Sequence, residues 1–141
     1  MYHYRKTIQT YKKLNKADVH RSVCTFCNEV GGANITAENE TMFVIPNRVS
    51  YDIFEGRRVI EHLMVIPKRH VETIVEFTDK EKIDQMTIAG EYEANGFNIY
   101  ARGVGSVTRS VKHQHTHLIK ADNNRPKVFM YIAKPHFLIQ G

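Results

Sequence analysis

The sequence predicts an α+β domain, in which an antiparallel β-sheet of about five strands has helices packed on one face. Two observations favour this class. Extended apolar segments follow one another with mostly short connections, which suit antiparallel neighbours, and one strong helix signal falls between the second and the third of them. The chain has 141 residues and can bury a sizeable core without disulfides. We expect residues 21–141 to form the domain and residues 1–20 to precede it.

The first stretch is polar and rich in lysine and tyrosine. A helix over residues 5–14 would place Ile8, Tyr11 and Leu14 on one side, but the same composition suits a mobile arm. The sequence leaves both possibilities open. Residues 31–40 contain two adjacent glycines followed by polar residues, which indicates a turn-rich connection.

The first two strands are expected at Thr41–Val49 and Val59–Ile66, which are the extended segments that follow this connection. Between them Asp52, Glu55 and Gly56 interrupt the pattern. Short polar and glycine-containing interruptions of this kind predict a hairpin-like return.

The helix signal is the sequence Thr78-Asp79-Lys80-Glu81, which has the composition of a capping box. The helix should run to about Ala94, where Asn95-Gly96 ends it. Ile83, Met86 and Gly90 lie on one stripe of this helix.

Four further extended segments are expected after the helix. Phe97–Ala101 is the first, and a glycine-rich loop beginning at Gly103 leads from it into a histidine-containing strand at His113–Ile119. Val128–Ile132 and Phe137–Ile139 are the last two, separated by Lys134-Pro135.

The overall charge is modestly basic. The formal net charge is +5, from 20 basic and 15 acidic residues without a long block of one sign. This balance is compatible with anionic partners, although it is also typical of an ordinary soluble surface. No signal peptide is visible, and no apolar run approaches the ~20 residues needed to span a bilayer. We therefore expect a soluble cytoplasmic protein that is not associated with membranes.

Two cysteines, Cys24 and Cys27, have the spacing of a zinc-binding pair. A tetrahedral site needs two further ligands, and His70 and His113, at the edges of expected strands, could supply them. Two ordinary thiols or a redox pair remain open alternatives. A thioredoxin-like role would require the pair to open a helix within a βαβ unit, which the sequence does not indicate.

Three histidines, His113, His115 and His117, stand at alternate positions. On an extended strand they would share one face, about 7 Å apart. Neutral imidazole can attack phosphorus and form a covalent intermediate, while neighbouring imidazoles, Ser110 and the amides of the loop 103–110 support the phosphoryl oxygens. The alternative is a strand that only binds metal.

These residues carry a resemblance to a known family. His113–Ile119 (HQHTHLI) resembles the signature of the histidine triad (HIT) superfamily of nucleotide hydrolases and transferases. Glu61–Val71 (EHLMVIPKRHV) is similar to a second segment of the family, Gly96–Ile99 (GFNI) to a third, and Cys24–Cys27 (CTFC) to the cysteine pair of many zinc-containing bacterial members. The four segments follow in the family's order over residues 24–120, so a HIT-like fold is implied.

The resemblance implies roles for single residues. His115 falls at the position of the nucleophile that attacks the α-phosphate, and His117 at the third triad position, which lines the phosphate site. Ser110 and His62 match residues beside the same phosphate, and Asp52 is implied more loosely as a ribose contact.

The resemblance also implies a structural zinc ion. Its ligands would be Cys24, Cys27, His70 and the first triad histidine, His113, with His62 as the other candidate for the third ligand. Four protein ligands leave no open position, so such an ion would hold the triad in place rather than act in catalysis.

The sequence departs from the family pattern at several positions. Gln114 and Thr116 replace residues that are usually apolar, which suggests a wetter or unusually packed opposite face. Arg102 and Arg109 stand near positions usually occupied by asparagine and glutamine. Their extra positive charge would suit a more anionic substrate, and Arg109 is therefore included among the expected substrate contacts.

The sequence is compatible with two functions. The first is a hydrolase or nucleotidyltransferase acting at the α-phosphate of a nucleoside phosphoramidate or dinucleoside polyphosphate, with a purine nucleotide or conjugate as ligand and a homodimer as the expected assembly. The second is a zinc-stabilised module that binds nucleotide or RNA without turnover. Under the first, nucleic acid is not an expected partner.

Overall fold

The structure is a computed structural model that describes residues 3–19, 24–32, 34–124, 129–133 and 136–140. Within these residues the main sheet has six strands in the order β1-β2-β4-β6-β5, with β3 paired to β4, and every pair is antiparallel. This arrangement confirms the predicted fold class. The strands are β1 (Ala37–Glu38), β2 (Met42–Pro46), β3 (Ile53–Phe54), β4 (Arg57–Pro67), β5 (Asn98–Ala101) and β6 (Thr116–Ala121).

The turn between β3 and β4 is the expected hairpin return. Its two residues, Glu55 and Gly56, both have positive φ, 50° and 72°. Positive φ at both central positions is the feature of a type I′ turn, whose twist matches that of the flanking strands.

The helix α2 (Asp79–Ala94) begins where the sequence signal places it. The Thr78 hydroxyl accepts a hydrogen bond from the backbone N–H of Glu81, and the Glu81 carboxylate accepts one from the backbone N–H of Thr78. This is the predicted capping box. Gly96, with φ of 84°, follows the C-cap Asn95 and ends the helix in the left-handed conformation.

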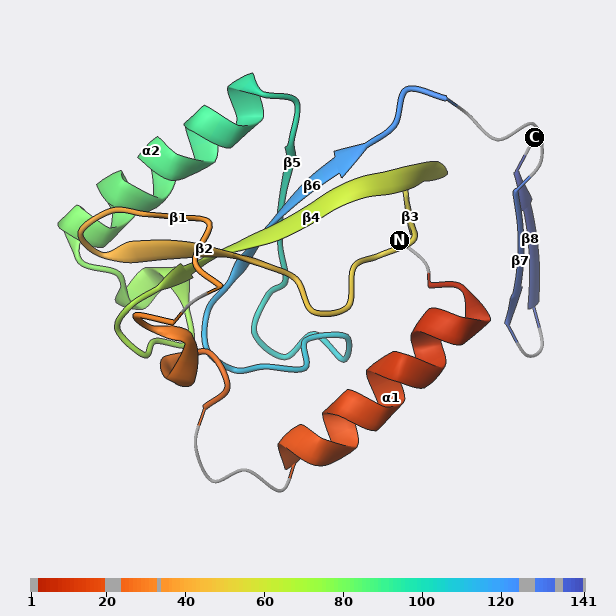
Figure 1. Ribbon diagram of the computed structural model, residues 1–141, viewed down its shortest axis with the longest axis horizontal. Coiled ribbons are helices and arrows are strands. Elements are labelled where there is room, and N and C mark those ends of the chain that lie inside the picture. The colour runs from red at the N-terminus through yellow and green to blue at the C-terminus, as the bar shows by residue number, and fades with distance from the viewer. Residues whose placement is uncertain (1–2, 20–23, 33, 125–128, 134–135, 141) are drawn as a thin grey trace.

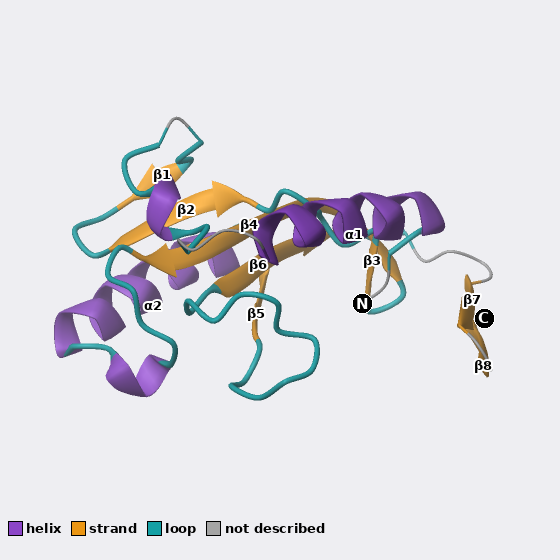
Figure 2. Cartoon of the chain, turned by 90° about the horizontal axis from the view of Figure 1, so that it is seen from below, coloured by secondary structure: helices purple, strands orange, loops and turns teal. Residues whose placement is uncertain are grey.

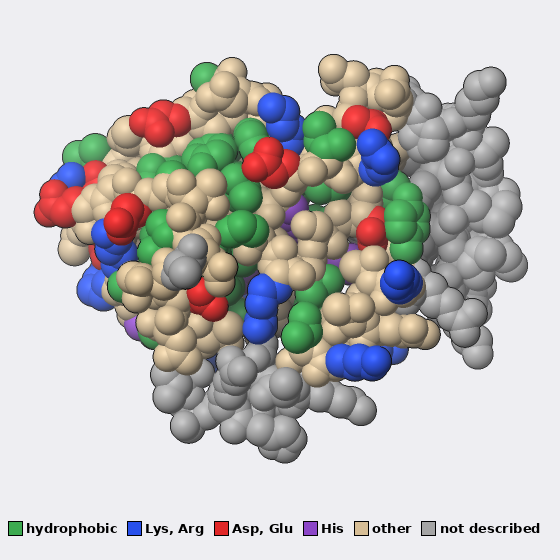
Figure 3. Space-filling view, in the orientation of Figure 1, with side chains coloured by type: hydrophobic (Ala, Val, Ile, Leu, Met, Phe, Trp, Pro, Cys, Tyr) green, Lys and Arg blue, Asp and Glu red, His purple; other side chains and the backbone are tan. Residues whose placement is uncertain are grey.

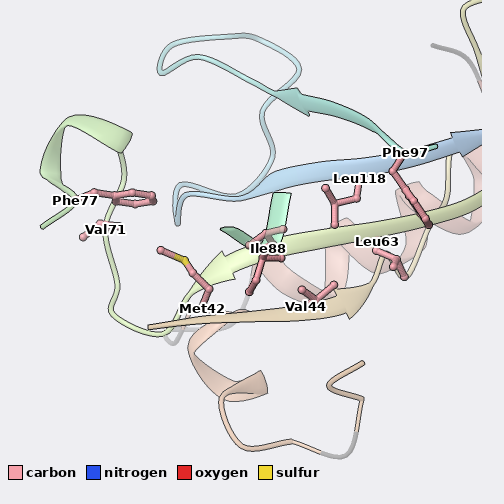
Figure 4. Close-up of a cluster of buried hydrophobic side chains, with 9 residues drawn as sticks. Met42, Val44, Leu63, Val71, Phe77, Ile88, Phe97 and Leu118 are labelled. Atoms are coloured by element: carbon pink, nitrogen blue, oxygen red, sulfur yellow. The ribbon is translucent and has the colours of Figure 1, made fainter. Parts of the chain in front are cut away.

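The larger apolar core lies between α2 and one face of the sheet (Figure 4). Leu63 of β4 lies directly opposite Leu118 of β6, and Ile88 of α2 joins them. Side chains from β2 and from the loops flanking α2 complete the cluster. Its members are Met42, Val44, Leu63, Val65, Val71, Phe77, Ile88, Phe97 and Leu118.

The stripe of Ile83 and Met86 is not the buried side of α2, because these side chains are 62% and 67% exposed. A polar contact sets the rotation of the helix. The Asp84 carboxylate accepts a hydrogen bond of 2.8 Å from the Thr41 hydroxyl, next to β2. Asp84 and Ile88, one turn apart, therefore face the sheet, while the apolar stripe faces outward.

The opposite face of the sheet carries a second core of Phe26, Phe43, Ile45, Met64 and Ile66. The helix α1 (Arg5–Val19) also covers this side, so that the sheet lies between α1 and α2 (Figure 1). The two helices therefore lie on opposite faces of the sheet, and not on one face as expected. From below, α1 is seen to lie across the sheet (Figure 2).

The helix α1 settles the choice between helix and arm for the N-terminal stretch, and it extends five residues beyond the expected end at Leu14. Ile8, Tyr11 and Leu14 are half-buried on its inner side, as the spacing predicts. None of the helices in the described part of the chain has the length and apolar character needed to cross a membrane.

The last two strands, β7 (Phe129–Ala133) and β8 (His136–Gln140), pair only with each other among the described strands and form a separate two-stranded sheet beyond the main one (Figure 1). They match the two extended segments expected near the C-terminus. Val128 and Lys134-Pro135 lie outside the described residues.

Candidate active site and metal centre

The histidine row leads into β6 and is buried throughout. His117 lies within the strand, whereas His113 and His115 precede it in a connection whose backbone is tied by a 2.7 Å hydrogen bond from Gln114 N–H to the Val71 carbonyl. The row is therefore not one extended strand, and its members meet different neighbours.

His113 faces a cluster of metal-binding side chains. One donor atom from each of two cysteines and two histidines lies within 4.8 Å of the others. The distance from Cys27 Sγ to His70 Nδ1 is 3.3 Å, and that from Cys24 Sγ to His113 Nδ1 is 3.5 Å. A tetrahedral ion with bonds of about 2.3 Å to sulfur and about 2.0 Å to nitrogen has sulfur–nitrogen edges of about 3.5 Å. The Cys2His2 set of Cys24, Cys27, His70 and His113 therefore has the geometry to hold a metal ion.

Hydrogen bonding and burial put the side chains of this cluster in a state suited to binding a cation. His113 Nε2 lies 2.9 Å from the Pro67 carbonyl, which can only accept, so Nε2 carries the proton and the Nδ1 lone pair faces the cysteines. Burial lowers the pKa of His113 to about 4, which keeps the ring neutral. Burial and the neighbouring Cys24 thiol raise the pKa of Cys27, and a bound cation would favour the thiolate form of this residue.

His115 lines a cavity of the size of a small-molecule site. Its Nδ1 lies 2.8 Å from the His113 carbonyl, so Nδ1–H donates and Nε2 is left as the unprotonated nitrogen. Burial lowers the pKa of His115, so the ring is neutral at physiological pH. The edge of Phe26 packs against it, with ring centroids 5.2 Å apart. A neutral, oriented imidazole in a cavity is suited to nucleophilic attack.

His117 and His62 form a chain of hydrogen bonds with fixed direction. The backbone N–H of Tyr51 donates to His62 Nδ1 at 3.1 Å, which leaves the proton of neutral His62 on Nε2. That Nε2–H donates to His117 Nδ1 at 2.9 Å, which places the proton of neutral His117 on its own Nε2. This Nε2 is buried and has no partner among the described residues. His117 thus offers an unused donor at the site.

Burial also keeps this chain neutral. It lowers the pKa of His62 to about 3 and that of His117 to about 2, with mutual repulsion between the two rings as a further cause for His117. The side-chain amide of Asn47 lies 3.1 Å from Nε2 and 3.5 Å from Nδ1 of His62.

The cavity has a volume of about 580 Å³, which is the size of a small-molecule site. His115, His117 and Ser110 line one part of it. Near the middle of the face seen in Figure 3, histidine side chains are visible as small areas between their neighbours. The apolar walls come from α1 and from the second core: Ile8, Tyr11, Leu14, Phe26, Ile45, Met64 and Val111.

No protein-family model matches the sequence, and no curated protein matches it. Solved structures do. A HIT family hydrolase from Clostridium thermocellum is similar with a TM-score of 0.57 at 18% identity, over 77% of this chain and 99% of that chain. A member of the HIT family from Bacillus subtilis has a TM-score of 0.53 at 26% identity, over 70% of this chain and 72% of that chain. A hypothetical histidine triad nucleotide-binding protein from Sulfolobus tokodaii has a TM-score of 0.56 at 21% identity, over 78% and 77%.

The chain has the histidine triad (HIT) fold. The resemblance seen in the four sequence segments is thereby confirmed at the level of the fold. These matches cover 70–78% of the chain, so part of it has no counterpart in them.

Within the HIT fold, the residues expected at the substrate are not all in the cavity. Ser110 lines it, and His62 reaches it only through His117. Arg109 is used inside the chain: it donates to the carbonyl of Glu72 at 2.6 Å and to those of two residues that precede the triad. It is not among the described residues that line the cavity.

Asp52 also lies elsewhere. Its carboxylate accepts a 2.7 Å hydrogen bond from the backbone N–H of Tyr4 and one of 3.2 Å from the Thr7 hydroxyl. A carboxylate at this position binds the amino-terminal end of α1, where it complements the helix dipole. The segment around Asp52 thus holds the amino-terminal end of α1, a contact that a comparison of motifs does not reveal.

Gln114 and Thr116, the departures from the apolar pattern, are both buried. Thr116 Oγ1 accepts a 2.6 Å hydrogen bond from Gln85 Nε2 of α2. A polar pair therefore replaces apolar packing between β6 and α2, and the expectation of an unusual partner on this face is confirmed for Thr116.

The sequence reasoning missed two contributors to the site. Tyr51 is buried with its ring 4.5 Å from that of His62 and 5.5 Å from that of His117, measured between centroids. The helix α1 forms a wall of the cavity. The spacing of Ile8, Tyr11 and Leu14 predicts a covered face but does not say which surface covers it.

Proposed function

We propose that this protein hydrolyses or transfers nucleotides at the α-phosphorus of a nucleotide conjugate, through a covalent nucleotidyl intermediate on His115. The observation that carries the proposal is that His115 lines the cavity while a backbone carbonyl holds its Nδ1–H, which leaves Nε2 as the unprotonated nitrogen. Two of the similar solved structures are described as HIT family hydrolases and two as histidine triad nucleotide-binding proteins, which supports the same class.

In the first step His115 Nε2 attacks phosphorus, a nitrogen–phosphorus bond forms, and the bond to the leaving group breaks. The imidazole gains positive charge, and the hydrogen bond from Nδ1–H to the His113 carbonyl becomes stronger as it does so. The unpartnered Nε2–H of His117 is suited to a phosphoryl oxygen. In the second step water or another acceptor attacks phosphorus and releases His115.

We propose a purine nucleotide or its conjugate as the ligand, because the cavity combines these polar groups with a broad apolar wall. Ile8, Tyr11 and Phe26 contribute to that wall. A flat heteroaromatic base is suited to apolar and aromatic side chains, while the phosphate is suited to the histidines.

The metal ion proposed for the Cys2His2 cluster is zinc. Two thiolates and two imidazoles at tetrahedral distances are its preferred ligands. Its role would be structural, since it would tie Cys24 and Cys27 to His113, two residues before the nucleophile.

A homodimer is proposed as the assembly. The strand β5 is the last of the main sheet and exposes Ile99 (45%), and α2 exposes Ile83 and Met86. An open strand edge and apolar side chains on the adjacent helix suit burial against a second copy. Light scattering after size exclusion would give the mass of two chains, and Met86→Glu would shift it toward one.

The function is tested by turnover of adenosine 5′-phosphoramidate and of a diadenosine polyphosphate. Wild-type protein is expected to release adenosine monophosphate from at least one of them, and His115→Ala to reduce kcat/KM by about 10³-fold or more. His136→Ala, a histidine in the separate β7–β8 sheet, is the matched control and should retain activity. Equal rates for wild type and His115→Ala, or no turnover by wild type, would contradict the proposal; binding without turnover would indicate a nucleotide-binding module.

A further inference from the structure

Arg102 lies on the histidine side of the sheet, at the cavity. The pairing of β5 with β6 sets Tyr100 opposite His117 and ends with Ala101 opposite Thr116. Arg102 directly follows β5 and His115 directly precedes β6, so the two residues lie next to the last pair of this ladder. Both line the same cavity.

The position of the Arg102 guanidinium is fixed by Tyr51. Nη2 of Arg102 donates to the Tyr51 hydroxyl at 2.7 Å, and the guanidinium carbon lies 5.6 Å from the centroid of the Tyr51 ring. The Tyr51 ring in turn packs against His62 and His117. The positive charge is therefore held at a defined place beside the triad.

Two arginines and one acidic residue are among the described side chains that line the cavity. Of the described side chains that line it, Arg48 and Arg102 carry positive charge at neutral pH, and Glu29 carries negative charge. After burial, the charges of Arg109 and Arg102 lower the pKa of His115. Burial, the neighbouring His62 and His115 rings and Arg102 lower that of His117.

We propose that Arg102 is a specificity-determining residue that binds an anionic leaving group. The preferred substrates would then be nucleotide anhydrides that release a phosphate or a nucleoside polyphosphate, rather than phosphoramidates that release an amine. The inference rests on the proposed function and deepens it by naming the substrate class.

The two leaving groups make opposite demands on the site. When His115 Nε2 attacks an anhydride at the α-phosphorus, the bridging phosphorus–oxygen bond breaks and its electron pair stays on the departing phosphate oxygen. A fixed guanidinium stabilises that charge. When a phosphoramidate is attacked, the phosphorus–nitrogen bond breaks and the amine takes up a proton as it leaves. A neutral or cationic product gains nothing from Arg102.

The test compares two substrates that share an adenylyl group, diadenosine tetraphosphate and adenosine 5′-phosphoramidate. Arg102→Gln should lower kcat/KM for the anhydride by about ten- to a hundredfold, the range expected for a hydrogen bond to a charged group, and change that for the phosphoramidate by less than about threefold. Arg102→Lys, which keeps the charge, should recover part of the loss. Arg58→Gln, at a largely exposed arginine of β4, is the matched control and should change neither value.

Equal losses on both substrates would overturn the inference, because they would mean that Arg102 only supports Tyr51. Tyr51→Phe checks this directly, since it removes the hydroxyl that holds Arg102 while keeping the charge, and the anhydride should again be the more affected substrate. Melting curves of each variant report whether it is folded.

If wild-type protein turns over neither substrate, the proposed function is wrong and the anion preference is measured by equilibrium binding instead. Wild type should bind adenosine diphosphate more tightly than adenosine monophosphate, and Arg102→Gln should remove most of that difference. Equal affinities of wild type for the two nucleotides would overturn the inference independently of catalysis.

Discussion

The two faces of the sheet use neighbouring residues of the same strands for different purposes. On the α2 face, Leu63 and Leu118 lie opposite each other in an apolar core. On the other face, the residues one position away, His62 and His117, are joined by a 2.9 Å hydrogen bond beside the cavity. Successive side chains of a strand point to opposite faces, so one residue packs in the core while its neighbour lies at the candidate site.

The difference teaches how a row of buried histidines can be kept in place. Apolar packing on the α2 face fixes the backbone of β4 and β6, and this also limits the movement of the histidines on the other face. On the histidine face, directional contacts hold the rings in place. Backbone carbonyls accept hydrogen bonds from His113 and His115, His62 donates to His117, and His113 also belongs to the Cys2His2 cluster.

The largest effect is expected from removing the metal ion. Purified protein should contain about one zinc per chain by elemental analysis, and Cys24→Ser should lose it together with more than about 4 kcal/mol of unfolding free energy. His70→Gln should lose the metal as well. His62→Gln is the matched control and should retain it, because His62 contacts Tyr51 and His117 instead. Metal-free wild type with unchanged stability would contradict the assignment.

A pair of neighbouring substitutions then separates the two faces. Leu118→Ala should lower the unfolding free energy by about 2–5 kcal/mol, because it opens a cavity in the fully buried core, while the folded fraction keeps most of its activity. His117→Gln should do the reverse, reducing kcat strongly with a smaller loss of stability. Denaturant unfolding and initial rates measure both. Similar profiles for the two variants would mean that the faces are not functionally distinct.

The histidine face should also make stability depend on pH. Burial lowers the pKa of His62 to about 3 and that of His117 to about 2, while both are near 6.5 in the unfolded chain. Between these values the unfolded state binds more protons, so unfolding free energy is fully present above pH 6.5 and falls as the pH decreases. The expected loss from pH 7 to pH 5 is on the order of 1 kcal/mol per histidine. A His117→Gln variant should show a smaller slope; an unchanged slope would count against burial of a neutral ring.

The smallest effect concerns α1, which closes the cavity on the histidine face. Asp52→Ala removes the acceptor for Tyr4 N–H and the Thr7 hydroxyl and should destabilise the helix by about 1 kcal/mol. Hydrogen exchange of the α1 amides should accelerate while that of α2 does not. Asp52→Asn keeps an acceptor oxygen, so its α1 amides should exchange faster than those of wild type but more slowly than those of Asp52→Ala. No change in α1 exchange in the alanine variant would show that Asp52 does not hold the helix.

The features predicted from the sequence are those that depend on local pattern. The capping box at Thr78 and the turn at Glu55-Gly56 are confirmed because their signals lie within a few residues. The four residues of the Cys2His2 cluster were predicted from spacing and resemblance, and the structure brings their potential donor atoms together.

The features that the sequence did not predict depend on contacts between distant segments. Asp52 was expected at a ribose, but the carboxylate is bound by α1, some 45 residues away in the chain. Arg109 was expected at the substrate, but backbone carbonyls bind it. The stripe of Ile83 and Met86 faces outward because Thr41 fixes the rotation of α2 through Asp84. Where a polar side chain has several possible partners, the tertiary structure determines which of them it contacts.

The central claim is that His115 carries the nucleotide during the reaction, and the stereochemical course at phosphorus tests it most directly. A substrate with a chiral α-phosphorothioate is hydrolysed in isotopically labelled water, and the configuration of the product is determined. Each in-line displacement inverts phosphorus, so attack by His115 followed by attack of water predicts net retention. Net inversion would show a single displacement by water and would contradict the account.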